Sequence, residues 1–143
     1  MSGDPFDLQR FVDAQDPVYA AVLEELEAGR KRGHWMWYVF PQVEGLGGSA
    51  MAQAYAIGSR EEAAAYAAHP ILGARLRECT GRVLAVNGRT AEQIFSYPDY
   101  LKFRSCMTLF EQCAAEPEVF RAALVKYFDR QPDPLTLKIL NRV

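Results

Sequence analysis

Helix-start signals recur along the whole sequence and limit the fold classes that it can adopt. Residues 4–5 and 16–17 are both Asp-Pro, which places a capping acid before a proline suited to the first helical position. Ser59 and Glu62 have the spacing of a capping box, in which the glutamate reaches back to the Ser59 amide. Further starts are expected at Pro70, Thr90, Pro98, Pro117 and Asp133. A chain punctuated in this way is expected to consist of short helices.

Apolar residues follow these starts at helical spacing. The first start is followed by Leu8, Phe11 and Val12, and the second by Val18, Val22, Leu23 and Leu26. A chain of 143 residues can bury one sizeable core and has the usual length of one domain. We therefore expect an all-α fold, a compact single-domain bundle of six to eight short helices over residues 1–143.

The one candidate for a β-strand is 35–40, six large apolar residues in a row. Val39 is its single β-branched residue, Pro41 would interrupt a ladder of hydrogen bonds, and the chain offers no partner strand. We expect this stretch to be buried extended chain or a short helix.

The overall charge and the cysteines exclude several classes of protein. The net charge of −2 gives no general attraction to nucleic acid or anionic lipid. No apolar run approaches the roughly 18 residues of a membrane span, and the N-terminus lacks the pattern of a secretory signal. Three cysteines without a CxxC pair indicate reduced thiols, and with two histidines they argue against structural zinc. We expect a cytoplasmic protein without a bound metal or cofactor.

Residues 30–42, "RKRGHWMWYVFPQ", place three cations and a histidine beside the largest aromatics. The apolar neighbours of the aromatics are typical of a buried core. Cations and aromatics are also the groups that bind phosphate and stack on bases. We interpret the stretch as partly core and partly pocket, beside a flexible glycine loop at 44–49. His34 is the candidate acid–base group, because an imidazole exchanges protons near neutral pH.

A second polar cluster lies in "PDYLKFRSCMTLF", residues 98–110. On a helix, Asp99, Lys102, Ser105 and Cys106 follow one another at three- and four-residue steps and share a face. A purely structural alternative is an ordinary Asp99–Lys102 surface ion pair. No base is fixed beside Ser105 or Cys106 in the sequence, so a nucleophilic pair cannot be assigned.

Several blocks of the sequence resemble one known family. "DPFDLQRFVDAQ", "AGRKRGHWMWYVFPQ", "EAAAYAAHPILGARLREC" and "PDYLKFRSCMTLF" are similar, in this order and spacing, to the signature blocks of domain of unknown function 1810. The resemblance runs over nearly the whole chain and implies a single helical domain. It implies no activity.

A second, partial resemblance is to NADAR domains, helical enzymes that act on ADP-ribosyl groups. It rests on the order of a tyrosine-containing polar helix, an "EAA" helix and a later helix ending in Leu-Phe. NADAR domains carry a glutamate before the aromatic residues of the polar helix. Here that region is "SAMAQAYAIGS", which contains Gln53 and no acid.

We expect one cleft, bordered by residues 31–42, the glycine loop and residues 99–108. The leading hypothesis is that it binds or hydrolyses a nucleotide-like, ADP-ribosyl-type ligand, as a hydrolase of the glycosidic bond. Aromatic faces would stack on the base, and Lys31, Arg75 or Lys102 would meet phosphate. The expected acid–base and catalytic residues are His34, Asp99 and Lys102. The expected ligand-binding residues are Lys31, Trp35, Trp37, Gln42, Ser49, Tyr55, Arg75 and Ser105.

Two alternatives remain open from the sequence. The chain could be a non-catalytic module whose grooves bind a protein partner, or it could bind RNA or single-stranded DNA through its basic stretch, which its net charge disfavours. Within that stretch we expect Arg30 and Arg32 to be exposed and Lys31 to turn toward the cleft. We also expect at least one of the two indoles to be buried.

Overall fold

The structure is a computed structural model that describes residues 3–142, so the ends of the expected 1–143 domain lie outside the described residues. Within the described residues there are ten helices and no β-strand, which confirms the all-α prediction. The helices are α1 Gln9–Gln15, α2 Tyr19–Glu27, α3 Met36–Val39, α4 Ala50–Ala54, α5 Arg60–Ala68, α6 Leu72–Ala85, α7 Ala91–Phe95, α8 Asp99–Cys113, α9 Glu118–Phe128 and α10 Pro134–Leu140. The number exceeds the expected six to eight because of two short helices: α3 lies in the stretch expected to be buried extended chain or a short helix, and α4 directly follows the glycine loop.

Several predicted helix starts are confirmed in atomic detail. The Asp133 carboxylate accepts from the Thr136 amide at the start of α10, and Pro134 is the first helical residue. Thr90 caps α7 through a complete capping box with Gln93. His69 Nδ1 accepts from two backbone N–H groups at the start of α6, which makes it the helix-boundary residue that Pro70 indicated.

Other predicted starts are wrong by a few residues. α1 begins at Gln9, although the Asp4 carboxylate does accept from the amides of Leu8 and Gln9. α2 begins at Tyr19 without a side-chain cap, because Asp16 instead forms an ion pair with Arg75 at 2.8 Å. At the start of α5, Ser59 caps as expected, but the Glu62 carboxylate accepts from the amide of Gly58 rather than that of Ser59.

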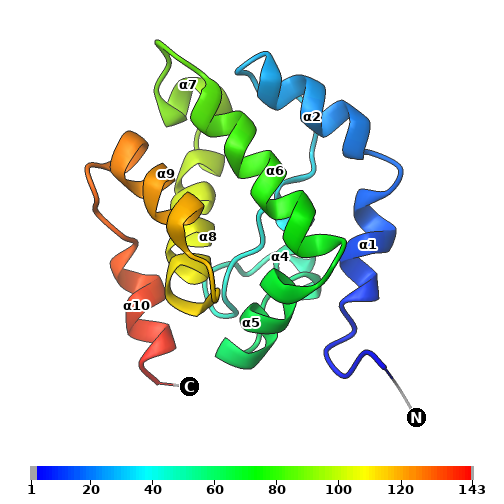
Figure 1. The fold of residues 1–143 in the computed structure, drawn as a ribbon. Coiled ribbons are helices and arrows are strands. Elements are labelled where there is room, and N and C mark those ends of the chain that lie inside the picture. Colours follow the sequence, from blue (N-terminus) through cyan, green and yellow to red (C-terminus); the bar gives the residue numbers. More distant parts are fainter. Residues whose placement is uncertain (1–2, 143) are drawn as a thin grey trace.

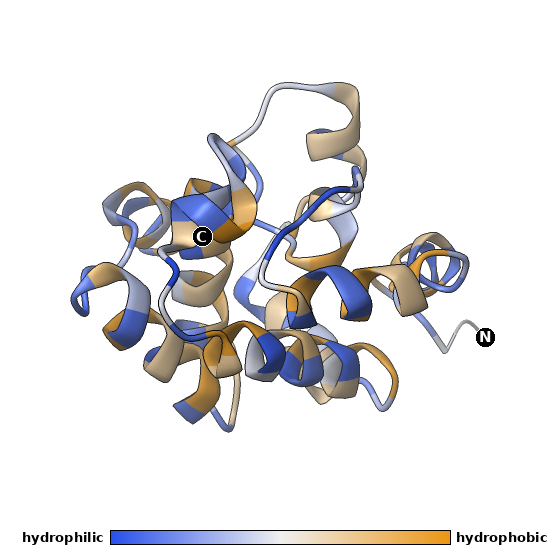
Figure 2. Cartoon of the chain, turned by 90° about the horizontal axis from the view of Figure 1, so that it is seen from above, coloured by the Kyte–Doolittle hydropathy of each residue, from blue (hydrophilic) through white to orange (hydrophobic). Residues whose placement is uncertain are grey.

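The long helices α6 and α8 organise the core. α6 packs against α2, α5 and α9, and α8 packs against α5, α7, α9 and α10 (Figure 1). Blue and orange segments alternate along most helices in Figure 2, as expected of amphipathic helices that bury one face. The fully buried aromatic side chains are Phe11, Phe40, Tyr66, Phe95, Phe103, Phe110 and Phe120. Phe103 of α8 lies at their centre, with its ring 4.7 Å from that of Phe95 and 5.1 Å from that of Phe40.

The strand candidate at 35–40 is a buried short helix, which is one of the two structures expected for it. α3 occupies its middle, and Trp35 and Phe40 at its ends are 2% and 1% exposed. The chain then runs extended, and Val43 forms an isolated bridge with Ile57. This bridge fixes the two ends of the loop that contains the glycines and α4.

The end of α2 determines where the basic triplet points. Gly29 has a φ of 72°, and the N–H groups of Gly29 and Arg30 donate to carbonyls of the last helical turn, as in a Schellman motif. This turn breaks the helical phase, and the Lys31 amide then donates to the Ile94 carbonyl of α7 at 2.7 Å. Arg30 and Arg32 are exposed, which confirms that expectation, and Lys31 turns inward to pair with Asp99.

None of the helices in residues 3–142 has both the length and the apolar character needed to cross a bilayer. The longest, α8, has 15 residues, whereas a span needs about 20.

Candidate functional site

The polar face of α8 opens onto a hollow at the surface, which we call the α4–α8 groove. Lys102 and Ser105 lie one turn apart on α8 and both line it, while Cys106 on the adjoining face is buried in the core. The groove has a volume of about 460 Å³. Its lining residues are Gln42, Leu46, Gly47, Gly48, Ser49, Ala52, Pro98, Leu101, Lys102, Ser105, Asp133 and Leu135.

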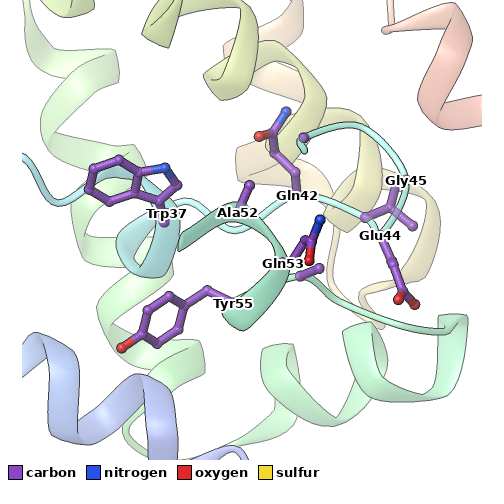
Figure 3. Close-up of a pocket in the computed structure, with 10 residues that line it drawn as sticks. Trp37, Gln42, Glu44, Gly45, Ala52, Gln53 and Tyr55 are labelled. Atoms are coloured by element: carbon purple, nitrogen blue, oxygen red, sulfur yellow. The ribbon is translucent and has the colours of Figure 1, made fainter. Parts of the chain in front are cut away.

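A smaller hollow, the Trp37 pocket, adjoins α4 and has a volume of about 30 Å³; Figure 3 shows residues that line it. Trp37 reaches it from α3 and Tyr55 from the end of α4. Gln42, Gly47 and Ala52 line both hollows, so the two hollows adjoin. Where one cleft was expected from the sequence, the structure has two adjoining hollows.

Asp99 connects the two lysines of the expected site. Its carboxylate lies 2.8 Å from Lys31 Nζ and 3.5 Å from Lys102 Nζ. The Lys31 side chain is 7% exposed, whereas that of Lys102 is 26% exposed. The shorter and more buried Lys31–Asp99 contact is therefore the principal ion pair, and Lys102 is the more accessible cation.

Each lysine also lies over a tryptophan. Lys31 Nζ is 5.1 Å from the centre of the Trp35 ring, and Lys102 Nζ is 5.5 Å from that of Trp37. Both distances are within the range of a cation–π interaction. Trp35 is 2% exposed and Trp37 is half-buried, so the prediction that at least one indole is buried is confirmed. Trp37 alone offers part of its surface to the solvent beside the accessible lysine.

Glu25 of α2 holds the Trp35 side of this arrangement. Its Oε1 accepts from the backbone amides of Arg32 and Gly33 and from Trp35 Nε1, at 2.7 to 3.0 Å. Burial alone would raise the pKa of Glu25, but these hydrogen bonds and the nearby Lys31 outweigh it and hold the pKa below its usual value. Glu25 therefore holds the Trp35 indole in its buried position, and this ring does not line the groove.

A polar cluster closes the far end of the groove, where α10 meets α8. Asp133 Oδ2 accepts from the amide and the hydroxyl of Thr136, at 3.0 and 2.6 Å, and lies 3.4 Å from Ser105 Oγ. The Asp133 amide donates to Thr108 Oγ1 at 2.8 Å. The Ser105 hydroxyl also donates to the Leu101 carbonyl at 3.0 Å. These contacts hold the Asp133 carboxylate in one orientation at the groove wall.

The structure brings together about half of the residues expected at the site. Gln42, Ser49, Lys102 and Ser105 line the α4–α8 groove, and Trp37 and Tyr55 line the adjoining pocket with Gln42. Of these side chains, Ser49 already accepts from the Ala52 amide as the cap of α4.

The other expected residues lie elsewhere. His34 is exposed at the surface and lines neither hollow, because the turn before α3 directs it outward. Trp35 is buried, and Lys31 pairs with Asp99 beside the groove instead of lining it. Arg75 projects from α6 toward α1, where it contacts Gln15 and Asp16. The expectation that these residues border one cleft is therefore wrong.

Several residues of the groove were missed by sequence reasoning, among them Asp133, Leu101 and Leu135. Asp133 was recognised as a helix cap, but its place opposite Ser105 depends on the packing of α10 against α8. Leu101 and Leu135 are 38% and 50% exposed and line the groove. Apolar residues at helical spacing indicate core, so their exposure could not be read from the pattern.

Within residues 3–142, no group of three or more histidine, cysteine, aspartate or glutamate side chains is arranged to hold a metal ion. The thiols are not activated either. Burial raises the pKa of Cys79 to about 12 and raises that of Cys106 well above its usual value. The groove offers hydrogen-bonding groups, one accessible cation, the Asp133 carboxylate and apolar surface.

Comparisons with known proteins agree with the fold and state no activity. The model of a family described as a protein of unknown function, DUF1810, matches residues 5–140. Among solved structures, the chain is similar to the conserved hypothetical protein Rv1873 from Mycobacterium tuberculosis, with a TM-score of 0.95 and 56% sequence identity. This match covers 96% of the present chain and 99% of the other. No curated protein matches the sequence.

Proposed function

Because the chain belongs to the DUF1810 family, whose description names no function, we propose an activity from the groove: the protein binds a nucleotide-like ligand there. The observation that carries the proposal is the pairing of Lys102 with Trp37 between the two hollows. An accessible cation and a partly exposed indole, 5.5 Å apart, are the groups that meet a phosphate and stack on a base. An ADP-ribosyl group is the ligand type we propose.

The ion pairs support the assignment of Lys102 to the ligand. The buried Lys31 already neutralises Asp99 at 2.8 Å, and Lys102 approaches the same carboxylate only to 3.5 Å. A partly exposed pair of this kind contributes less than about 1 kcal/mol, so a phosphate competes with Asp99 for Lys102 at little cost. Lys31, by contrast, is buried and stays paired with Asp99.

The shape of the groove is also consistent with such a ligand. Its volume of about 460 Å³ falls in the range of roughly 300–1,000 Å³ that is usual for small-molecule sites. Its walls combine apolar residues with a few polar groups, among them Gln42 and Ser105. Such a composition buries the body of a ligand and orients it through a small number of hydrogen bonds.

We propose binding alone, because none of the three residues expected to be catalytic is placed to act as an acid–base group in the groove. Hydrolysis of a glycosidic bond requires an acid–base group beside the ligand. His34, the expected candidate, lines neither hollow, and the Asp99 carboxylate is engaged by two lysines. Lys102 is left with the role of an electrostatic partner.

The test is a thermal-shift screen of nucleotides, nucleotide sugars and inorganic pyrophosphate, followed by calorimetric titration. A ligand at 100 times its dissociation constant stabilises the folded state by about 2.7 kcal/mol. We expect Lys102→Met and Trp37→Leu to weaken binding, and the exposed Lys138→Met on α10 to serve as a matched control with unchanged affinity. If no nucleotide raises the melting temperature, or if Lys138→Met weakens binding as much as Lys102→Met, the proposal fails.

The second candidate is a protein-interaction module. It is favoured by Leu101 and Leu135, which are exposed to 38% and 50% and lie on the same groove. An apolar side chain of a partner segment would cover them. In that case Leu101→Ser would abolish capture of the partner, and nucleotides would not change the melting temperature of the protein.

The third candidate, binding of RNA or single-stranded DNA, rests on the exposed Arg30 and Arg32. It predicts that a labelled oligonucleotide binds with strong salt dependence and that Arg30→Ala and Arg32→Ala weaken the binding. Binding that persists in both variants would exclude the basic stretch as the contact surface.

A further inference from the structure

We propose that Asp133 selects ligands that carry a hydroxylated group beyond their phosphates, so that the groove prefers a nucleoside diphosphate sugar to a nucleoside diphosphate. This inference rests on the proposed function, because it assumes that Lys102 meets phosphate and Trp37 meets the base. It assigns a role to the end of the groove that the Lys102–Trp37 pair does not explain.

The first step is the state of the Asp133 carboxylate. Its Oδ2 is occupied by the amide and hydroxyl of Thr136 and lies 3.4 Å from the Ser105 hydroxyl. Its other oxygen, Oδ1, accepts no hydrogen bond from any residue in the described part of the chain, and Asp133 lines the groove. A carboxylate held by one oxygen presents the other as a fixed acceptor.

The second step is the order of the groups along the groove. Lys102 contacts the Trp37 ring, and Ser105 follows three residues, about 4.5 Å, further along α8. Asp133 Oδ2 lies 3.4 Å from Ser105 Oγ. Trp37 therefore contacts the α8 face at Lys102 and Asp133 contacts it at Ser105, so the two meet α8 at successive positions.

The third step matches this order to a ligand. Base, phosphate and a further group would meet Trp37, Lys102 and Asp133 in turn. The further group must donate hydrogen bonds, because an ionised carboxylate only accepts them, and it must not be a phosphate, because two anions repel. The hydroxyl groups of a sugar attached to the distal phosphate fulfil both conditions. The Ser105 hydroxyl next to Asp133 can accept a second such donor.

The experiment compares ADP-ribose with ADP by calorimetric titration, because the two ligands differ in the distal sugar. Asp133→Asn keeps an oxygen for the Thr136 cap and changes the groove-facing group from acceptor to donor, and asparagine is an equally good cap. Asp133→Ser keeps a cap and removes the groove-facing oxygen. Far-UV circular dichroism and the melting temperature of each variant establish that it is folded.

We expect wild-type protein to bind ADP-ribose more tightly than ADP, and both variants to lose about tenfold in affinity for ADP-ribose, the loss typical of one hydrogen bond to a charged group. Affinity for ADP should stay the same or rise. Equal affinity of the wild type for the two ligands, or an equal loss for both ligands in the Asp133 variants, would overturn this inference while leaving the proposed function intact. Binding of neither ligand to the wild type would overturn both.

Discussion

The two ion pairs of Asp99 should differ in strength, and the difference can be measured with a pair of double-mutant cycles. Lys31 and Asp99 have side chains that are only 7% and 19% exposed, and their charged atoms are 2.8 Å apart. Removing one partner of a fully buried pair costs about 3–5 kcal/mol, because the other charge remains uncompensated. The partial exposure of Asp99 and the proximity of Lys102 reduce this, and we expect a Lys31–Asp99 coupling energy of at least about 1.5 kcal/mol. For Lys102 and Asp99, at 3.5 Å and more exposed, we expect less than about 0.5 kcal/mol.

The cycles use Lys31→Met, Lys102→Met and Asp99→Asn, alone and in pairs. Urea unfolding followed by far-UV circular dichroism reports the helices, independently of the tryptophans beside the lysines. A coupling of about 1.5 kcal/mol corresponds to a shift of roughly 5 °C in melting temperature for a domain of this size. If the two couplings are equal, or if that of Lys102 is the larger, the reasoning that leaves Lys102 available for a ligand is refuted.

Three further predictions follow from side chains around the groove and core. Trp35→Ala should lower the free energy of unfolding by about 3–5 kcal/mol and Trp37→Ala by less than half of that, since Trp35 is 2% exposed; equal losses in urea unfolding would contradict this. Because the pKa of Glu25 is lowered, its ionised carboxylate stabilises the fold above the unfolded pKa of about 4.3, and this stabilisation is lost as pH falls through the folded pKa. Glu25→Gln should therefore be less stable than the wild type at pH 7 and lose less stability between about pH 5 and pH 3. If the free energies of unfolding of the two proteins fall in parallel over this range, the prediction is wrong. A thiol reagent at pH 8 should modify the half-buried Cys113 slowly and the other two cysteines only after unfolding, because burial raises the pKa of Cys79 to about 12; rapid modification of more than one thiol in the native state would disprove it.

The local signals of helix ends could be read from the sequence because the groups that form them are neighbours in the chain. Thr90 and Asp133 bond to amides three residues away, and Gly29 ends α2 through its own left-handed backbone. Asp16 shows where such local signals fail to predict a helix start. Its carboxylate is drawn to Arg75, 59 residues away, and a contact over that separation leaves no local pattern.

The composition of the groove could be predicted only in part for the same reason. Lys102 and Ser105 share a face of one helix, so their spacing alone brings them together. That Asp133 faces Ser105 depends on how α10 packs on α8, and that His34 points outward depends on the turn before α3. We expected Lys31 to turn inward, although an unbroken helical phase would favour Arg30, which lies four residues after the buried Leu26. The structure explains this by the break of phase at Gly29.

The most direct test of the proposed binding site is a titration of isotopically labelled protein with ADP-ribose, observed by nuclear magnetic resonance at the two indole N–H groups. Trp37 lies beside Lys102 and is partly exposed, whereas Trp35 is buried and donates to Glu25. We predict that the Trp37 signal shifts with ligand concentration, that the Trp35 signal stays in place, and that Lys102→Met suppresses the shift. A Trp37 signal that does not respond while ADP-ribose is bound would contradict the assignment of the ligand to this groove.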